Sequence, residues 1–302
     1  MSYRGEHNYL IENANYSDYT GVDFSKESID DLKKLWKASL DKGMHGVCFS
    51  LYEDGQEPGD IITLEQVIRR IEIIKPYTGW VRSFSCIEGN EHIPLVAKEN
   101  GLKTLVGAWL GDDLELNEKE IEGLISLAKD GLVDIAAVGN EVMYRGDLTE
   151  EQLLEYIYRV KEALPGIPVG YVDAYYEFSH RQKITDACDV ILANCYPYWE
   201  GCGLEDSLNH MQQMFGQATD AGQGKQVIIT ETGWPSEGGN LKGAFSSEEN
   251  AMKYFINAQK WSSKENIPMF YFSSFDESWK VGTEGDVGAY WGLWDKNEKL
   301  KF

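Results

Sequence analysis

The stretch from Lys225 to Ser236, KQVIITETGWPS, decides the fold. Residues 226–230 are largely apolar or β-branched and include no turn former, a pattern typical of a strand buried on both faces. Glu231 stands where that strand is expected to emerge, and the Gly-Trp-Pro run at 233–235 then stops the extended pattern and sets a flat ring beside the acid. A carboxylate next to an aromatic ring suits a sugar, although an acid at a strand end is also often only solvated.

A second stretch has the same design. Residues 133–142 read VDIAAVGNEV, a short apolar run that ends in Gly139, Asn140 and Glu141. Two glutamates at the carboxyl ends of two parallel strands can face one another across the mouth of a barrel. Such a pair is what glycosidic-bond cleavage requires, because one acid protonates the leaving oxygen while the other attacks the anomeric carbon and forms a covalent intermediate.

Outward from these two stretches, short apolar runs alternate with helical patterns along the rest of the chain. The runs predict strands at 45–51, 79–86, 103–110, 135–139, 168–173, 189–195, 226–230 and 269–275. Eight strands alternating with helices predict an α/β fold, a single (β/α)8 TIM barrel over residues 28–302 with no large subdomain. Residues 1–27 lack a sustained period and are expected to form an N-terminal extension that wraps the barrel or is partly disordered.

Capping residues predict where several of the helices begin. Thr63 with Gln66 and Thr149 with Gln152 have the spacing of capping boxes. Asn117 is expected to cap the helix after the third strand. In the same way, 246–249 is expected to cap the helix before the eighth strand.

Composition narrows the class of partner. The formal net charge is −22, from 28 Lys and Arg against 50 Asp and Glu in 302 residues. That charge repels polyanions, which argues against nucleic acid and against an acidic membrane surface, whereas a neutral polymer meets no such repulsion. No apolar run approaches the length of a membrane span. We expect no membrane partner, and a monomer.

The cysteines and the N-terminus bear on the compartment. Five cysteines cannot all pair, and no CxxC spacing suggests a metal or redox site, so buried thiols are expected, with a local bridge between Cys195 and Cys202 left open. The first ten residues contain no apolar leader, so the chain is either cytosolic or has lost a signal. The sequon at 15–17 points to secretion, and a glucan substrate would favour an extracellular or cell-wall location.

Five motifs in order resemble glycoside hydrolase family 17. They are GNE at 139–141, NCYPY at 194–198, ETGWPS at 231–236, FDESWK at 275–280 and WGLW at 291–294. The resemblance spans residues 45–295. It implies a retaining enzyme that acts on β-1,3-glucan with a (β/α) barrel, Glu141 as acid/base and Glu231 as nucleophile.

The resemblance extends to other polar residues at the predicted strand ends. Asn140 is expected to bind the 2-hydroxyl of the sugar in the cleavage subsite, or to cap backbone. Tyr196 is expected to donate its hydroxyl to the nucleophile, or to be an ordinary half-buried tyrosine. Apart from the resemblance, Arg82, within the strand predicted at 79–86, is expected to orient the nucleophile or to neutralise an acidic barrel mouth.

A second group of residues is expected to bind substrate. Glu277 and Lys280 match family positions near the site, and they equally fit an ion pair that fixes the last loop. Tyr144, three residues past the acid/base, and Trp199 with Glu200, just past the NCYPY motif, are expected to flank a sugar on the leaving-group side. Large aromatic side chains are nevertheless buried more often than displayed.

One departure from the family concerns the outcome of the reaction. Plant members carry a subdomain between the two motifs at 194–198 and 231–236, whereas here one helix fills most of that interval. The cleft should therefore be shorter and more open, and the intermediate can be resolved by water or by a sugar hydroxyl. Hydrolysis and β-1,3-glucanosyl transfer both stay open.

Other classes of protein lack their motifs here. The sequence contains no HExxH, no GxSxG and no GxxxxGK. Because carboxylates supply acid, base and nucleophile, we expect no cofactor and no metal. The partner is expected to be β-1,3-glucan or laminari-oligosaccharides. The remaining alternative is a non-catalytic β-glucan-binding barrel, against which the retention of both glutamates weighs.

Overall fold

Helices and strands alternate as the patterns predict, and the strands close into a barrel. The computed structural model describes residues 17–302. The strands are β1 (Met44–Cys48), β2 (Thr78–Ser83), β3 (Lys103–Ala108), β4 (Ile135–Asn140), β5 (Val169–Ala174), β6 (Val190–Asn194), β7 (Val227–Thr232) and β8 (Met269–Tyr271). Each strand pairs in parallel with the next, and β8 pairs with β1. The prediction of a (β/α)8 TIM barrel is confirmed.

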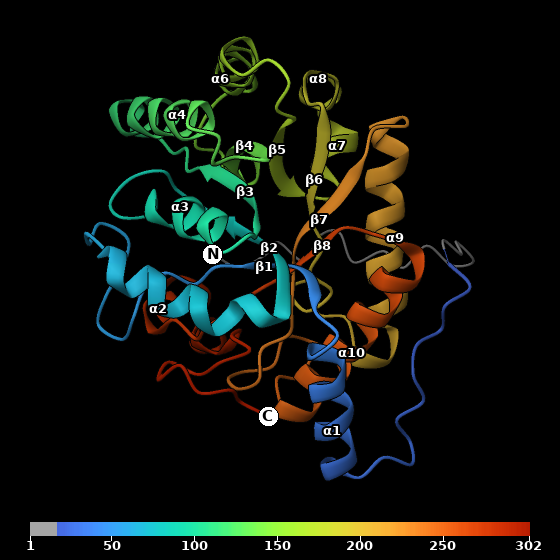
Figure 1. The fold of residues 1–302 in the computed structure, drawn as a ribbon. Coiled ribbons are helices and arrows are strands. Elements are labelled where there is room, and N and C mark those ends of the chain that lie inside the picture. The colour runs from blue at the N-terminus through green and yellow to red at the C-terminus, as the bar shows by residue number, and fades with distance from the viewer. Residues whose placement is uncertain (1–16) are drawn as a thin grey trace.

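The helices form a ring around the strands (Figure 1). The helices are α1 (Ile29–Leu40), α2 (Leu64–Ile74), α3 (His92–Glu99), α4 (Leu114–Lys129), α5 (Val142–Arg145), α6 (Glu150–Ala163), α7 (Glu177–His180), α8 (Gln182–Ala187), α9 (Leu204–Gly222), α10 (Glu248–Glu265) and α11 (Val281–Glu284). Short 3-10 turns lie at Lys75–Tyr77, Ser278–Lys280 and Asp286–Tyr290. The long helices bury one apolar side against the sheet, which is why their sequences show a 3.6-residue period.

The strands are buried on both faces, as their continuous apolar runs predict. Every residue of β4, β5, β6 and β7 is buried. The interior is packed closely enough that Gly46 of β1 has no room for a side chain, because a Cβ there would lie 2.4 Å from the Phe270 ring. The barrel is therefore a solid core, and only its ends can hold a site.

The pairing is irregular at the carboxyl ends of three strands. The register shifts between Ala137 and Asn140 on β4, between Ala193 and Asn194 on β6, and before Thr232 on β7. Such irregularities redirect side chains and are frequent beside active sites. They lie in the strands that carry the two glutamates and in the strand between β5 and β7.

Several predicted element bounds differ from the structure. β7 continues to Thr232, so Glu231 lies within the strand and not after it, and β8 already ends at Tyr271. Asn117 does not cap α4; Asp113 does, and Asn117 lies buried one turn later with its side chain bonded to Gly111. The cap of α10 is the second serine of the predicted segment, with its hydroxyl accepting from the third helical amide.

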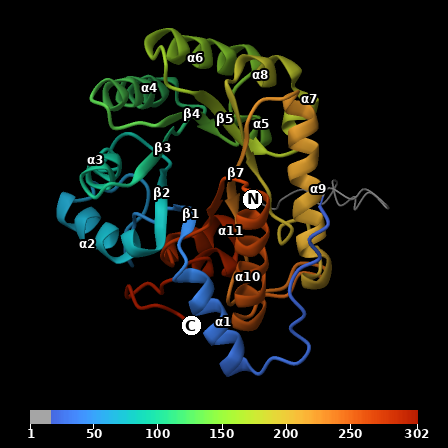
Figure 2. The same ribbon diagram turned by 45° about the vertical axis from the view of Figure 1, so that its right-hand side comes forward.

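The described part of the N-terminal extension runs beside α9 and α10 toward α1 (Figures 1 and 2). The amide of Val22 donates to Asn257 Oδ1 at 2.9 Å, and Gln212 Nε2 donates to the Tyr19 carbonyl at 2.9 Å. Residues 17–27 thus lie against the barrel. Residues 1–16, with Asn15 and Tyr16 of the sequon, lie outside the described residues.

All five cysteines are buried free thiols, so the bridge between Cys195 and Cys202 is not formed. Burial raises the pKa of Cys48 and Cys202 to about 12, which keeps both thiols protonated and unreactive.

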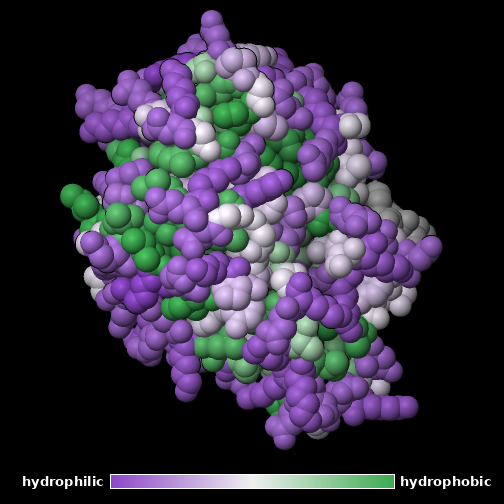
Figure 3. All heavy atoms as spheres, in the orientation of Figure 1, coloured by the Kyte–Doolittle hydropathy of each residue, from purple (hydrophilic) through white to green (hydrophobic). Residues whose placement is uncertain are grey.

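In residues 17–302 no helix is both long and apolar enough to cross a membrane. Hydrophilic residues cover most of the face seen in Figure 3, with apolar residues in scattered groups between them.

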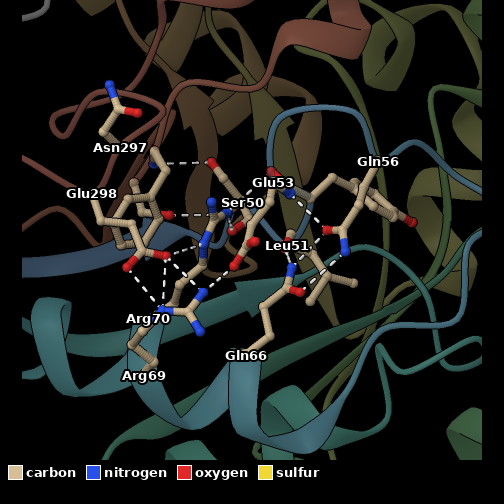
Figure 4. Close-up of polar contacts among 12 residues, drawn as sticks. Ser50, Leu51, Glu53, Gln56, Gln66, Arg69, Arg70, Asn297 and Glu298 are labelled. Carbon is tan, nitrogen blue, oxygen red and sulfur yellow. Dashed lines mark hydrogen bonds and ion pairs between the residues drawn. The ribbon is translucent and has the colours of Figure 1, made fainter.

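A polar cluster fixes the loop after β1 to α2 and to the C-terminal segment (Figure 4). Arg70, whose side chain is fully buried, donates to the carbonyls of Ser50 and Tyr52 and to Glu298 Oε1 at 3.0 Å. Arg69 donates to the same carboxylate, at 2.9 Å from Oε2. The loop that Arg70 holds reaches the barrel mouth, because the amide of Tyr52 donates to Glu277 Oε1 at 3.0 Å.

Candidate active site

Two glutamates meet at the carboxyl ends of β4 and β7. Glu231 lies in β7, and Glu141 follows β4 directly and begins α5 with a left-handed backbone, φ 53°. That conformation costs a side-chain-bearing residue about 1–3 kcal/mol and persists only where the surroundings enforce it. The turn into α5 was not predicted, and it decides the position of the Glu141 carboxyl.

One amide nitrogen touches both acids. Asn194 Nδ2, at the end of β6, donates to Glu141 Oε1 at 2.9 Å and to Glu231 Oε1 at 3.2 Å. Because both oxygens bond the same nitrogen, they lie no more than about 6 Å apart. The two acids therefore lie close together at the mouth of the barrel.

Glu231 is held by three donors, one on β2, one at the end of β6 and one just past β6. Besides Asn194, Arg82 Nη1 lies 2.7 Å from Oε1, and the hydroxyl of Tyr196 donates to Oε2 at 2.8 Å. Arg82 also donates through Nη2 to Asn140 Oδ1 at 2.7 Å. The sequence-predicted residues Arg82, Asn140, Tyr196 and Glu231 are thus brought into one hydrogen-bonded group.

Glu141 has a raised proton affinity. Enclosure by protein, followed by the nearby charge of Glu231, raises the pKa of Glu141 to about 7. Burial, and then the same charge, raises the pKa of Tyr196 well above its usual value, so its phenol stays a donor. Burial alone would lower the pKa of Arg82, but the charges and hydrogen bonds of Glu231 and Cys48 together outweigh it, and the pKa rises. Glu141 can therefore hold a proton near neutral pH while it faces a carboxylate held by charged and neutral donors.

The segment after β8 adds a second charged group. Lys280 Nζ lies 2.6 Å from Glu277 Oε2 and 4.3 Å from the centre of the Phe272 ring, so the predicted ion pair is present. Glu284, in α11, was not predicted as part of the site. Burial raises its pKa to about 7, with Lys280 opposing and the charge of Glu231 adding to the rise. Glu284 is therefore a further acid that interacts electrostatically with the charged groups at the barrel mouth.

The expected leaving-group side is only partly open. Tyr144, in α5, is partly exposed, and its amide donates to Asp173 Oδ2 at 3.3 Å. Trp199 is also partly exposed, and its ring packs 5.3 Å from that of Trp291.

Glu200 is buried against His210, whereas Tyr144 and Trp199 are partly exposed. It is 1% exposed, and its Oε2 lies 2.6 Å from His210 Nε2. A sugar hydroxyl would have to displace His210 from that oxygen, so sugar binding by Glu200 stays a prediction.

A metal centre requires several clustered His, Cys, Asp or Glu side chains. In residues 17–302 no three or more His, Cys, Asp and Glu side chains cluster in a way that could hold a metal ion. The polar groups at the mouth are instead bonded to one another, as the contacts of Arg82, Asn194 and Glu231 illustrate. What this arrangement offers chemically is a paired acid and carboxylate.

Comparison with known proteins identifies the family. Residues 46–292, which include both glutamates and all of β2 to β8, match the model of the BtgE/BtgC glycoside hydrolase domain. The chain belongs to the BtgE/BtgC glycoside hydrolase family. It is thus a glycosidase of a β-1,3-glucan-processing family, as its motifs predicted.

Several fungal proteins are similar to this chain. A glucan 1,3-beta-glucosidase of Arthroderma benhamiae is 29% identical over 252 residues, which is 76% of this chain and 81% of the relative. That of Saccharomyces cerevisiae is 26% identical over 258 residues, 77% of this chain and 82% of the relative. The crystal structure of a glycoside hydrolase family 17 beta-1,3-glucanosyltransferase from Rhizomucor miehei has a TM-score of 0.77 and 29% identity, and the match covers 86% of this chain and 96% of that one.

Two residues at the site of this BtgE/BtgC family member, Asn194 and Glu284, were not predicted from the sequence. Asn194 opens the quoted motif at 194–198, yet it was not selected, although a polar residue closing an apolar strand is the same signal that selected Asn140. Glu284 lies between the FDESWK motif at 275–280 and the WGLW motif at 291–294, and no sequence signal distinguishes it from a solvated acid. Its link to the site is electrostatic, through the charges of Lys280 and Glu231.

Proposed function

We propose that this chain processes β-1,3-glucan with retention of configuration, by double displacement through a glycosyl-enzyme intermediate on Glu231. The observation that carries the proposal is the single Asn194 nitrogen bonded to both acids, which limits the distance between the bonded oxygens to about 6 Å. Retaining glycosidases keep their carboxyl groups about 5–5.5 Å apart, whereas inverting enzymes need about 6.5–9.5 Å to admit a water. The bound of about 6 Å favours retention.

In the first step Glu141 gives its proton to the glycosidic oxygen while Glu231 attacks the anomeric carbon. The leaving sugar departs with that proton, and Glu141 is left as a carboxylate. In the second step Glu141 takes a proton from water or from a sugar hydroxyl. The resulting oxygen attacks the anomeric carbon and frees Glu231. The raised pKa of Glu141, about 7, supports its role as the proton donor of the first step.

The residues around the acids have separate roles in this proposal. Arg82 and Tyr196 orient Glu231 for attack, because they bond different oxygens of the carboxylate. Arg82 occupies the amide oxygen of Asn140, so the Asn140 nitrogen is the end left to donate to the 2-hydroxyl of the sugar. That bond would strengthen in the transition state.

Substrate-binding roles are proposed for the outer residues. Glu277 and Lys280 would line the side of the groove next to the loop after β1, where Glu277 already accepts from Tyr52. Tyr144 and Trp199 would flank the acceptor sugar beyond Glu141, where both are partly exposed. Residues 28–302 would form the catalytic domain, and the charge of −22 supports a neutral glucan over nucleic acid.

Transfer to a sugar is proposed beside hydrolysis. The relatives of 29% identity include both a glucan 1,3-beta-glucosidase and a beta-1,3-glucanosyltransferase, and an active-site mutant of the latter has been crystallised with laminaritriose. The outcome depends on how well the acceptor subsites bind sugar relative to water. Incubation with laminari-oligosaccharides tests this point. Products longer than the donor demonstrate transfer, and a mixture of only shorter products demonstrates hydrolysis.

Two variants test the assignment of the acids. Wild type treated with a fluoro-sugar should carry a covalent label on Glu231, and E231A should carry none, as read by mass spectrometry of peptides. E141Q should lose activity on glucan while it keeps more of its activity on substrates with activated leaving groups, since only the former need protonation. E120Q, a buried glutamate replaced in α4, serves as the matched control and should remain active. A label on another residue, or inversion of the first-formed anomer, would overturn the proposal.

A further inference from the structure

Asn194 is a buried polar residue whose side-chain amide is fully hydrogen-bonded at the barrel mouth. It ends β6, its side chain is fully buried, and both ends of its amide are used. The nitrogen donates to Glu141 and Glu231, and the oxygen accepts from Thr230 Oγ1 at 2.9 Å. Thr230 is fully buried on the neighbouring strand β7. The threonine hydroxyl therefore distinguishes the two ends of the amide and turns the NH2 group toward the acids.

We propose that Asn194, oriented by Thr230, is a positioning residue that holds the two catalytic carboxyl groups at a fixed separation throughout the reaction. This inference rests on the proposed function, in which Glu141 and Glu231 are the acid/base and the nucleophile. The planar NH2 group has two hydrogens in a rigid fork, one for each carboxyl oxygen. A hydroxyl or a backbone amide in the same place would have a single hydrogen and could hold only one of them.

The charge of the pair moves during the proposed reaction, and Asn194 remains bonded to it. Before attack Glu231 is the anion and Glu141 carries the proton. In the intermediate Glu231 is a neutral ester, and Glu141 is the anion. The same NH2 group thus faces one full carboxylate in each state, and hydrogen bonds to charged acceptors are the strong ones. Asn194 can stabilise both states without moving.

Asn194 acts through the acids and not through substrate. Its exposed fraction is zero, so a sugar cannot contact its side chain without rearrangement of the mouth. Loss of the amide should accordingly change the rate of the chemical steps more than the binding of sugar. The split between kcat and KM separates this role from that of a subsite residue.

The pH profile gives a second readout. The hydrogen bond from Asn194 lowers the pKa of Glu141 against the larger raising effects of burial and of Glu231. Its removal should therefore move the alkaline limb of the activity profile to higher pH. Other titratable groups around the mouth also interact electrostatically with Glu141. They are Arg82 of β2, Arg145 of α5, Asp173 of β5, Tyr176 before α7 and Glu284 of α11.

The test compares N194A and T230V with wild type on laminari-oligosaccharides. N194A should lower kcat about 10- to 100-fold, the range expected for a lost hydrogen bond to a charged group, with KM within about twofold and the alkaline limb at higher pH. T230V keeps the volume of the side chain but removes the hydroxyl that orients the amide. It should lower kcat about 2- to 10-fold and shift the limb in the same direction.

T104V is the matched control. Thr104 is a buried threonine near the amino end of β3, and its hydroxyl donates to the Leu132 carbonyl at 2.6 Å. The acids lie at the carboxyl ends of β4 and β7, so T104V should keep the wild-type kcat and pH profile. If N194A does not fold, T230V against T104V still decides the question. Wild-type kcat and pH limb in N194A, or in a folded T230V, would overturn the inference. Retained glucan activity in E231A would overturn the proposed function instead.

Discussion

Arg82 is the residue that connects the most parts of the site. Its guanidinium bonds Glu231 through Nη1 and Asn140 through Nη2, both at 2.7 Å, and it lies 4.1 Å from the centre of the Phe84 ring. It is 2% exposed. A planar fork with donors in fixed directions can orient two partners at once, which a single ammonium cannot.

R82K should keep a positive charge in the site and lose one of the two bonds. We expect kcat to fall about 100-fold, in the range seen when one preorganised donor to a reacting group is removed. The fold should persist, since Glu231 keeps a cationic partner. Steady-state kinetics with laminari-oligosaccharides and circular dichroism measure the two effects. A kcat within threefold of wild type would mean that charge alone, and not the bridging geometry, is what Glu231 and Asn140 require.

The sequence predicted those site residues that lie within or directly after an apolar strand pattern. Glu141, Asn140, Glu231 and Arg82 each follow or belong to an apolar run, and a barrel brings such positions to one face. Which of them bond one another was not predictable, because that depends on strand register and on irregular pairing. Glu200 shows the opposite case, since a position just beyond a strand can also turn its side chain inward.

At the scale of elements, the order of strands and helices was predictable, and the ends were not. Alternating apolar runs and 3.6-residue patterns determine existence and type, which is why all eight strands were found. The four-residue α5 is too short to show a period, and it begins at a residue with a left-handed backbone that only surrounding contacts can enforce. The turn that orients the Glu141 carboxyl was thus outside the reach of pattern reasoning, although the place of Glu141 at the end of the fourth strand was not.

The cluster that holds the loop after β1 provides a prediction about stability. Glu298 accepts from Arg69 and from Arg70, and Arg70 is fully buried. E298Q keeps the shape but removes the charge, so Arg70 is left in the interior without its counter-ion. We expect the free energy of unfolding to fall by about 2 kcal/mol, the scale of a lost charged hydrogen bond in a buried place. Urea unfolding followed by fluorescence measures it.

The matched control for this prediction is E249Q. Glu249 pairs with Lys253 on the surface of α10, with its side chain 56% exposed, and exposed helix pairs contribute at most about 0.5 kcal/mol. Equal losses in E298Q and E249Q would show that burial of Arg70 does not matter. Because Tyr52 connects the same loop to Glu277, E298Q should also raise KM more than it lowers kcat.

At the scale of the whole molecule, acidic residues outnumber basic ones, 50 against 28. The net charge of −22 makes the chain repel itself at neutral pH. Burial raises the pKa of Glu120, Glu141 and Glu284 to about 7 and, against the pull of Lys301, that of Asp276 to about 6. His45 works in the opposite direction, because burial lowers its pKa to about 4. Four carboxyl groups against one imidazole set the sign of the pH dependence.

The protein should therefore be more stable at pH 5 than at pH 8. A carboxyl whose pKa is higher in the folded than in the unfolded chain binds its proton more tightly when folded. Its stabilising effect is complete below about pH 4.5 and is lost as the pH rises through about 7. For Glu120, 2% exposed, the loss is on the order of 3 kcal/mol. Thermal unfolding at pH 5, 6, 7 and 8 and constant ionic strength should give a Tm that falls by several degrees across the range.

E120Q should flatten that slope because it removes one titrating group, whereas E118Q, on the solvent side of the same helix, should leave it unchanged. A Tm that rises toward pH 8 would mean that these carboxyl groups are already ionised in the folded chain.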